Sequence, residues 1–157
     1  MLIGGFAIGQ YAVPRQTFDV DFLTTKENFN KILSKLKQAG FKLEDMRESF
    51  ARFRGTDHYL MDIDFMFVDK STLDKIAADG KEVTIANQKL MIPSINTLIA
   101  LKLHAIKNNQ KLREHKDLLD IINLIRENKI NYKSGEFRKL CLKYGTRELY
   151  DKILIGA

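Results

Sequence analysis

Two segments of the sequence place a pair of aspartates between large apolar residues. The first segment reads Asp19-Val20-Asp21-Phe22 and the second reads Asp62-Ile63-Asp64-Phe65. Side chains two positions apart on a strand leave the same face, so each segment predicts a strand with one acidic and one apolar face. If the two strands are neighbours in one sheet, three or four carboxylates converge on one patch. The chain must therefore fold around a sheet that is covered on its apolar face.

Paired carboxylates repel each other unless a cation holds them together. Mg²⁺ selects such oxygens and combines a few carboxylates with water and phosphate oxygens. Two metals held close together suit an in-line phosphoryl displacement. A single Asp-x-Asp motif is usually a solvated strand edge or turn, but two copies framed by apolar residues favour a metal site. Neither copy has the glycine and distal glutamate of an EF-hand loop, which argues against a calcium hand.

A glycine pair, Gly4–Gly5, follows a short apolar run at the start of the chain. Such a pair lets backbone N–H groups approach a phosphate and can open a helix whose N-terminus favours anions. The signal is weak alone, because two glycines also occur in ordinary tight turns. The sequence contains neither a P-loop motif nor the three spaced glycines of a dinucleotide-binding fingerprint.

Residues 1–93 alternate between strand and helix patterns, whereas the rest of the chain reads as helix only. The expected strands of the first part cover residues 2–7, 17–23, 49–54, 58–68, 82–86 and 89–92, and its expected helices run from Thr24 or Thr25 to Gly40 and over 71–78. The expected helices of the second part begin at Ser94 or Asn96 and reach 107, then cover 114–126, 136–143 and 146–154. We predict an α+β fold, a mixed sheet with helices packed on it, followed by a helical part over 94–157 that packs on the core as one compact unit.

The positive charge is concentrated in the second part of the chain. The sequence has 26 basic and 20 acidic residues, and residues 102–157 carry 13 of the basic and 7 of the acidic ones, so they account for the whole net charge of +6. This division suggests a polyanionic partner such as nucleotide phosphates or RNA. Solvated helix faces explain the charge equally simply, and on charge alone we favour that explanation because no run of basic residues occurs.

The remaining composition excludes several classes of protein. No segment reaches the length of apolar sequence that a membrane helix needs, and we expect a cytoplasmic protein without a membrane partner. The one cysteine, Cys141, rules out an internal disulfide framework, and we expect it to be a buried, inert thiol. The three histidines have no zinc-ligand spacing.

The order of these motifs resembles that of a known superfamily. The chain is similar to the DNA polymerase β-type nucleotidyltransferases in three motifs. These are Gly4–Gly5, the segment Pro14–Phe22 with its Arg-x-Thr-x-Asp-x-Asp motif, and the later Asp62–Phe65. The Arg-x-Thr-x-Asp-x-Asp motif is most similar to that of minimal nucleotidyltransferases and of the AbiEii-type toxins of toxin–antitoxin and abortive-infection systems. Leu98–Ala105 and Lys116–Ile121 resemble the C-terminal part of that group, so the resemblance covers roughly residues 2–125.

The resemblance implies a role for each matching residue. Asp19 and Asp21 would bind Mg²⁺ or Mn²⁺, and Asp64, which matches the third carboxylate better than Asp62, would bridge the metal or take the proton from the attacking hydroxyl. The residues implied in nucleotide binding are Gly4, Gly5, Arg15, Thr17 and Lys102. Asp117 or Asp120 would orient Lys102 or touch the substrate, and the family pattern leaves the choice between these two open.

The resemblance implies transfer of a nucleoside monophosphate from an NTP to a hydroxyl, with release of pyrophosphate. The expected acceptor is an RNA, such as a tRNA 3′ end, or a partner protein, in a toxin–antitoxin setting. The alternatives are a non-catalytic module that binds a partner protein, an antibiotic nucleotidyltransferase, and an RNA-binding protein without chemistry. Members of the family usually begin with a helix before the glycine turn. Here we expect either a longer natural protein or a sheet with an exposed flank.

Overall fold

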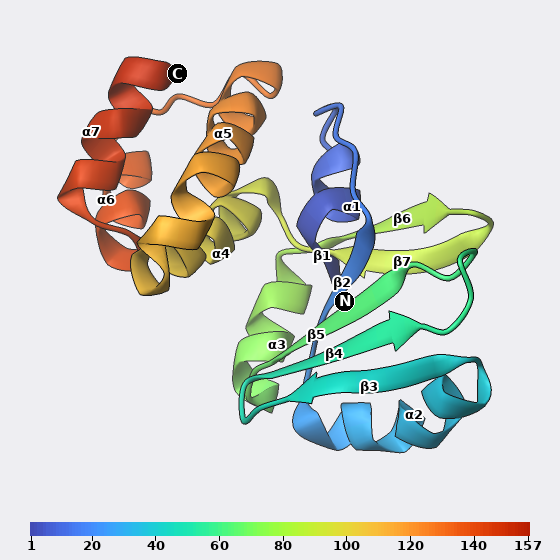
Figure 1. Ribbon diagram of the computed structural model, residues 1–157. Helices are drawn as coiled ribbons and strands as arrows, with labels where there is room; N and C mark the ends of the chain where they lie inside the picture. The colour runs from blue at the N-terminus through green and yellow to red at the C-terminus, as the bar shows by residue number, and fades with distance from the viewer. The chain divides into compact units, whose positions relative to one another are not determined.

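The computed structural model describes residues 1–157, and the chain forms two compact units (Figure 1). The first unit consists of Met1–Ala7 and Arg15–Ser94, and the second consists of Ile8–Pro14 and Ile95–Ala157. The elements of the first unit are β1 (Leu2–Ile3), β2 (Asp19–Thr24), α2 (Lys26–Gln38), β3 (Phe41–Met46), β4 (Phe50–Gly55), β5 (Asp62–Phe67), α3 (Lys70–Ala78), β6 (Lys81–Ile85) and β7 (Gln88–Ile92). A short helix, α1 (Gly4–Gly9), begins in the first unit directly after β1.

A five-stranded mixed sheet with the order β1-β2-β5-β4-β3 forms the centre of the first unit. The two strands that carry the aspartate pairs, β2 and β5, are parallel neighbours, and the other pairings in this sheet are antiparallel. The expectation that the two acidic strands lie side by side is confirmed. The β6–β7 hairpin forms a separate two-stranded sheet.

The apolar face of the sheet is covered by α2 (Figure 1). This helix begins where Thr25 accepts a hydrogen bond from the backbone N–H of Asn28, at 3.1 Å, as the capping pattern predicts. Its fully buried Phe29 packs against Phe53 and Phe65 of the sheet, with ring centroids 5.9 and 5.2 Å away. Since the core occupies this face, the aspartates of β2 and β5 are directed to the opposite one.

Three expectations about the strands are wrong. The strand expected over 2–7 ends at Ile3, because helix α1 begins at Gly4. The strand expected over 58–68 begins only at Asp62, because Asp57–Leu60 form a turn in which Leu60 N–H donates to Asp57 O. The strand β3 is absent from the sequence prediction, although it pairs with β4 from Phe41 to Met46, with one register shift between Leu43 and Asp45. It is an edge strand whose residues are alternately half-buried and exposed, so its apolar signal is diluted by charged side chains.

The second unit contains the four helices expected after Pro93. They are α4 (Ile95–Asn108), α5 (Gln110–Glu127), α6 (Gly135–Tyr144) and α7 (Arg147–Gly156). Helix α4 packs against α5 and α6, and α7 packs against α5 and α6. The core of this unit includes Leu103, Ile106, Ile121, Leu124 and Ile153, all fully buried.

Cys141 belongs to the same core, as expected for an inert thiol. Burial raises the pKa of this thiol to about 12, because the thiolate would lose its hydration. None of the helices has both the length and the apolar character of a membrane span.

Candidate metal and nucleotide site

Three carboxylates meet on the face of the sheet that α2 does not cover. In the parallel pairing of β2 with β5, Asp21 lies opposite Asp64 and Asp19 lies opposite Asp62. Asp19, Asp21 and Asp64 each place one carboxylate oxygen within 4.8 Å of the others. Asp64 is 5% exposed and the other two are half-buried. Two residues from one strand and one from its neighbour thus form a compact oxygen cluster.

The fourth carboxylate, Asp62, is held outside this cluster. Its Oδ1 accepts a hydrogen bond from the backbone N–H of Gly55 at 3.2 Å, and its Oδ2 lies 3.8 Å from Arg54 Nη1. The structure therefore brings together three of the four aspartates, and it places Asp64 with the β2 pair, as the sequence interpretation preferred.

Thr17 and the two glycines lie directly beside the carboxylates. The Thr17 hydroxyl contacts both the side chain and the backbone of Asp19, at 2.8 Å from Oδ1 and 3.2 Å from the carbonyl oxygen. A Cβ on Gly4, which has φ of +64°, would lie 1.8 Å from Asp21 Oδ2, and a Cβ on Gly5 would lie 2.7 Å from Thr17 Cβ. Only a backbone without side chains can approach the carboxylates this closely.

Arg52 on β4 lies at the site, although no motif in the sequence assigns it a role there. It lies directly opposite Asp64 in the antiparallel β4–β5 pairing. Its Nε donates to Asp64 Oδ1 at 2.8 Å and its Nη2 donates to Oδ2 at 2.6 Å. The signal was present in the sequence, because Arg52 and Arg54 repeat the two-residue spacing of the aspartates on the next strand.

The donor set matches a hard divalent cation. It consists of carboxylate oxygens alone, with no thiolate or imidazole among the ligand atoms, and its members come from adjacent strands. Mg²⁺ and Mn²⁺ prefer such oxygens, whereas zinc sites in proteins are rich in cysteine and histidine. The residues present therefore fit the metal implied by the sequence.

Lys102 forms a buried ion cluster within the second unit. Its Nζ lies 2.6 Å from Asp117 Oδ1 and 2.7 Å from Asp120 Oδ2, so both aspartates that the resemblance offered contact this lysine. The side chains are only 12%, 3% and 9% exposed. Asp117 Oδ2 has no hydrogen-bond partner and lies 3.9 Å from Arg113 Nη1. Arg15, the other expected phosphate contact, is half-buried in the segment before β2.

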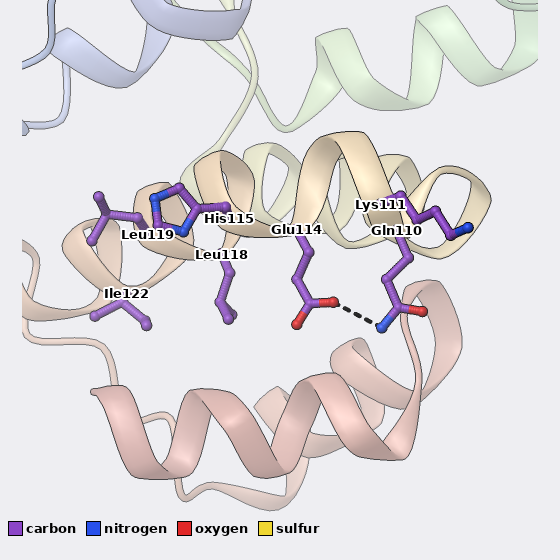
Figure 2. Close-up of a pocket in the computed structure, with 7 residues that line it drawn as sticks. All are labelled: Gln110, Lys111, Glu114, His115, Leu118, Leu119 and Ile122. Atoms are coloured by element: carbon purple, nitrogen blue, oxygen red, sulfur yellow. Dashed lines mark hydrogen bonds between the residues drawn. The ribbon is translucent and has the colours of Figure 1, made fainter.

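A groove of about 630 Å³ in the second unit contains none of the expected site residues (Figure 2). It runs along α5 and is lined by Gln110, Lys111, Glu114, His115, Leu118, Leu119 and Ile122. Gln110 donates to Glu114 at 2.7 Å across its polar end. Glu114 also pairs with Lys152 of α7. The groove has no acidic cluster and is not a candidate for the metal site.

The sequence model of one protein family matches nearly the whole chain. Residues 1–153 match the family described as nucleotidyl transferase AbiEii toxin, type IV toxin–antitoxin system. The chain belongs to the AbiEii family. It is therefore a nucleotidyltransferase, and the sequence resemblance is confirmed.

Solved structures place the AbiEii chain in the nucleotidyltransferase fold. The antibiotic-resistance factor ANT(2'')-Ia, solved in solution, aligns with a TM-score of 0.64 at 12% identity, covering 98% of this chain and 84% of the other. The lincosamide antibiotic adenylyltransferase LnuA, with lincomycin bound, aligns with a TM-score of 0.54 at 16% sequence identity, covering 78% of this chain and 83% of the other. An antigenic nucleotidyltransferase-like protein from Paracoccidioides brasiliensis aligns with a TM-score of 0.54 at 17% sequence identity, covering 99% of this chain and 83% of the other. No curated protein matches the sequence.

Proposed function

We propose that this AbiEii protein transfers a nucleoside monophosphate from an NTP to a hydroxyl of an RNA or of a partner protein, with divalent metal at Asp19, Asp21 and Asp64. The observation that carries the proposal is the convergence of these three carboxylates within 4.8 Å beside a glycine turn. Bound Mg²⁺ or Mn²⁺ would neutralise the charge that develops on the phosphates during transfer. Family membership supports the reaction class.

The residues of the first unit would then act by positioning. Thr17 fixes the rotamer of Asp19 through its hydroxyl, and the Gly4–Gly5 backbone would contact the triphosphate where a side chain has no room. Both oxygens of Asp64 accept hydrogen bonds from Arg52, which fixes the orientation of this carboxylate. The assignment of Arg15 and Lys102 to phosphate contacts stays a prediction from the resemblance.

The charge distribution supports a polyanionic acceptor. Net charge is +6 for the whole chain, and all of the excess lies in residues of the second unit, which favours a tRNA-like acceptor over a neutral small molecule. A different observation favours the antibiotic alternative, because two of the similar folds are described as an antibiotic adenylyltransferase and an antibiotic-resistance factor. Their identity to this chain is 12–16%, so their substrates are not transferred to it.

Labelled nucleotides test the activity and the acceptor together. We expect the protein, given each α-³²P-labelled NTP with Mg²⁺ or Mn²⁺, to label one class of acceptor in total RNA, in a cell lysate or among lincosamides and aminoglycosides. Asp19→Ala should reduce transfer by about 100-fold or more, because it removes a ligand from the oxygen cluster. Asp74→Ala, at an exposed position of α3 where the aspartate pairs with Lys70, is the matched control and should retain transfer.

The labelled class decides between the alternatives. Labelled RNA or protein supports the proposal, whereas labelled antibiotic alone supports the second candidate. A wild-type protein that labels nothing and binds neither metal nor NTP would instead be a non-catalytic binding module. An RNA affinity that persists in EDTA and in Asp19→Ala, and that falls steeply with salt, would indicate RNA binding without chemistry.

A further inference from the structure

Arg52 and a divalent metal ion require the same carboxylate. The guanidinium forms a two-pronged hydrogen bond with both oxygens of Asp64, at 2.8 and 2.6 Å. Asp64 also supplies one of the three oxygens of the candidate metal cluster. In a bidentate guanidinium–carboxylate pair, one lone pair on each carboxylate oxygen accepts a hydrogen bond. Only the second lone pair of each oxygen is then left to bind a metal ion.

The burial of Asp64 explains why a counter-ion is present. Its side chain is 7% exposed, and a buried carboxylate without a partner is strongly unfavourable. Arg52 supplies the compensating charge from the neighbouring strand. The pKa of Arg52 is raised above its ordinary value, chiefly by the hydrogen bond to Asp64 and further by the charges of Asp64, Glu44 and Asp19, so the guanidinium remains charged.

Arg52 also has a route away from Asp64. Its side chain is 41% exposed, whereas that of Asp64 is almost completely buried, so the arginine rather than the aspartate can move into solvent. In this same paired position its guanidinium carbon lies 5.5 Å from the centre of the Phe50 ring, so the cation also has a favourable contact outside the carboxylate cluster. Arg52 therefore pairs with Asp64 without being enclosed there.

We propose that Arg52 is a built-in competitor of the metal: it occupies Asp64 when no divalent cation is bound, and it withdraws at least one of its two hydrogen bonds when the metal binds. The inference rests on the proposed function, in which Asp19, Asp21 and Asp64 hold the metal. Its consequence is that Arg52 stabilises the metal-free protein and weakens the first metal-binding step. A metal ion and a guanidinium on one carboxylate also repel each other.

Replacing Arg52 by an apolar residue of similar length tests the competition. Arg52→Met keeps a flexible side chain of similar length and removes the charge and the guanidinium hydrogen bonds. The control is Arg54→Met, which makes the same change two residues along β4, where Arg54 pairs with Glu44 at 2.9 Å outside the metal cluster. We expect Mn²⁺, added without nucleotide and followed by calorimetry or electron paramagnetic resonance, to bind Arg52→Met about fivefold tighter or more than wild type. Arg54→Met should stay within about twofold of wild type.

Thermal melting gives a second readout that does not depend on activity. In EDTA, Arg52→Met should melt below wild type because Asp64 is left buried without its partner, and Mn²⁺ should raise its melting temperature by more than it raises that of wild type. An Arg52→Met variant that binds Mn²⁺ no tighter than wild type overturns the inference and leaves the proposed function standing. A wild-type protein that binds no Mn²⁺ contradicts both.

If Arg52→Met does not fold without metal, two further measurements decide. Arg52→Lys keeps the charge but loses the fork, and should bind Mn²⁺ more tightly than wild type but less tightly than an uncharged variant would. In the wild-type protein, the Nε–H signal of Arg52 in ¹⁵N-resolved NMR should shift as Mg²⁺ is added. A signal that is unchanged at saturating Mg²⁺ means that the fork stays in place, and this result overturns the inference.

Discussion

At the scale of single residues, the site depends as much on missing side chains as on charged ones. Gly4 lies against Asp21 in a backbone conformation, φ of +64°, that residues with a Cβ rarely adopt. The glycine therefore serves two purposes, a left-handed backbone and room for a carboxylate. Thr17 adds a hydroxyl that fixes Asp19.

We predict that Gly4→Ala damages both stability and metal binding. The backbone strain alone should cost about 1–3 kcal/mol, and the new methyl group must displace the Asp21 carboxylate. The control is Gly9→Ala at the end of the same helix, where a Cβ would meet nothing within 4 Å. Chemical denaturation and Mn²⁺ titration measure the two effects. A Gly4→Ala protein with wild-type stability and affinity would show that the close approach to Asp21 is unimportant.

At the scale of elements, the sequence predicted which segments are helices better than where strands begin and end. Helix caps such as Thr25 and apolar spacing are local signals, so α2 and the four helices of the second unit were found. Edge strand β3 was not, because its pairing with β4 supplies the hydrogen bonds that its half-charged sequence does not reveal. The Asp-x-Asp spacing predicted the shared acidic face of each strand.

The same contrast holds for the site: residues marked by a local motif were predicted, and residues placed by contacts between distant segments were not. The local pattern identified the aspartates, but the exclusion of Asp62 depends on a hydrogen bond from Gly55 that only the folded turn provides. The pairing of Arg52 with Asp64 depends on the register between β4 and β5. Register is set by turn geometry and by the burial of a whole face, so spacing within one strand cannot predict it.

The ion cluster between α4 and α5 gives a prediction at this scale. Lys102→Met removes the ammonium that contacts the buried carboxylates of Asp117 and Asp120, which should lower the free energy of unfolding by about 3–5 kcal/mol. Lys107→Met, an exposed position on the same helix, should change it little. Denaturant unfolding checks both variants. A Lys102→Met protein that keeps its stability and loses only nucleotide affinity would show that the lysine binds the nucleotide and does not stabilise the packing of α4 against α5.

At the scale of the whole molecule, the two units differ in charge. The first unit has equal numbers of basic and acidic residues, whereas the second carries the entire excess of +6. Hydration of helix surfaces accounts for some of the lysines. A polyanionic acceptor, as proposed, would make use of the excess through long-range attraction that falls with ionic strength.

Charge reversal in each unit tests whether the lysines of the second unit attract a polyanionic acceptor or only hydrate the helix surfaces. We predict that Lys139→Glu with Lys143→Glu, on exposed positions of α6, weakens RNA binding and makes it less dependent on salt. The same change at Lys35 and Lys37, exposed on α2 of the neutral unit, should have a smaller effect. Fluorescence anisotropy across a salt series measures both. Equal effects in the two pairs would indicate that net charge alone, rather than the second unit, attracts RNA.

The parallel pairing of β2 with β5 also has a consequence for how the protein is made. Asp21 and Asp64 are partners across two neighbouring strands that are separated in the chain by α2, β3 and β4, so their pairing is a long-range contact. Such a long-range contact forms late compared with local helices and hairpins. A ribosome-bound chain that has not yet exposed β5 therefore carries two of the three clustered carboxylates and no Arg52–Asp64 pair. Under the proposed function, we therefore expect a newly synthesised copy to gain activity only after β5 and its partner strands have emerged.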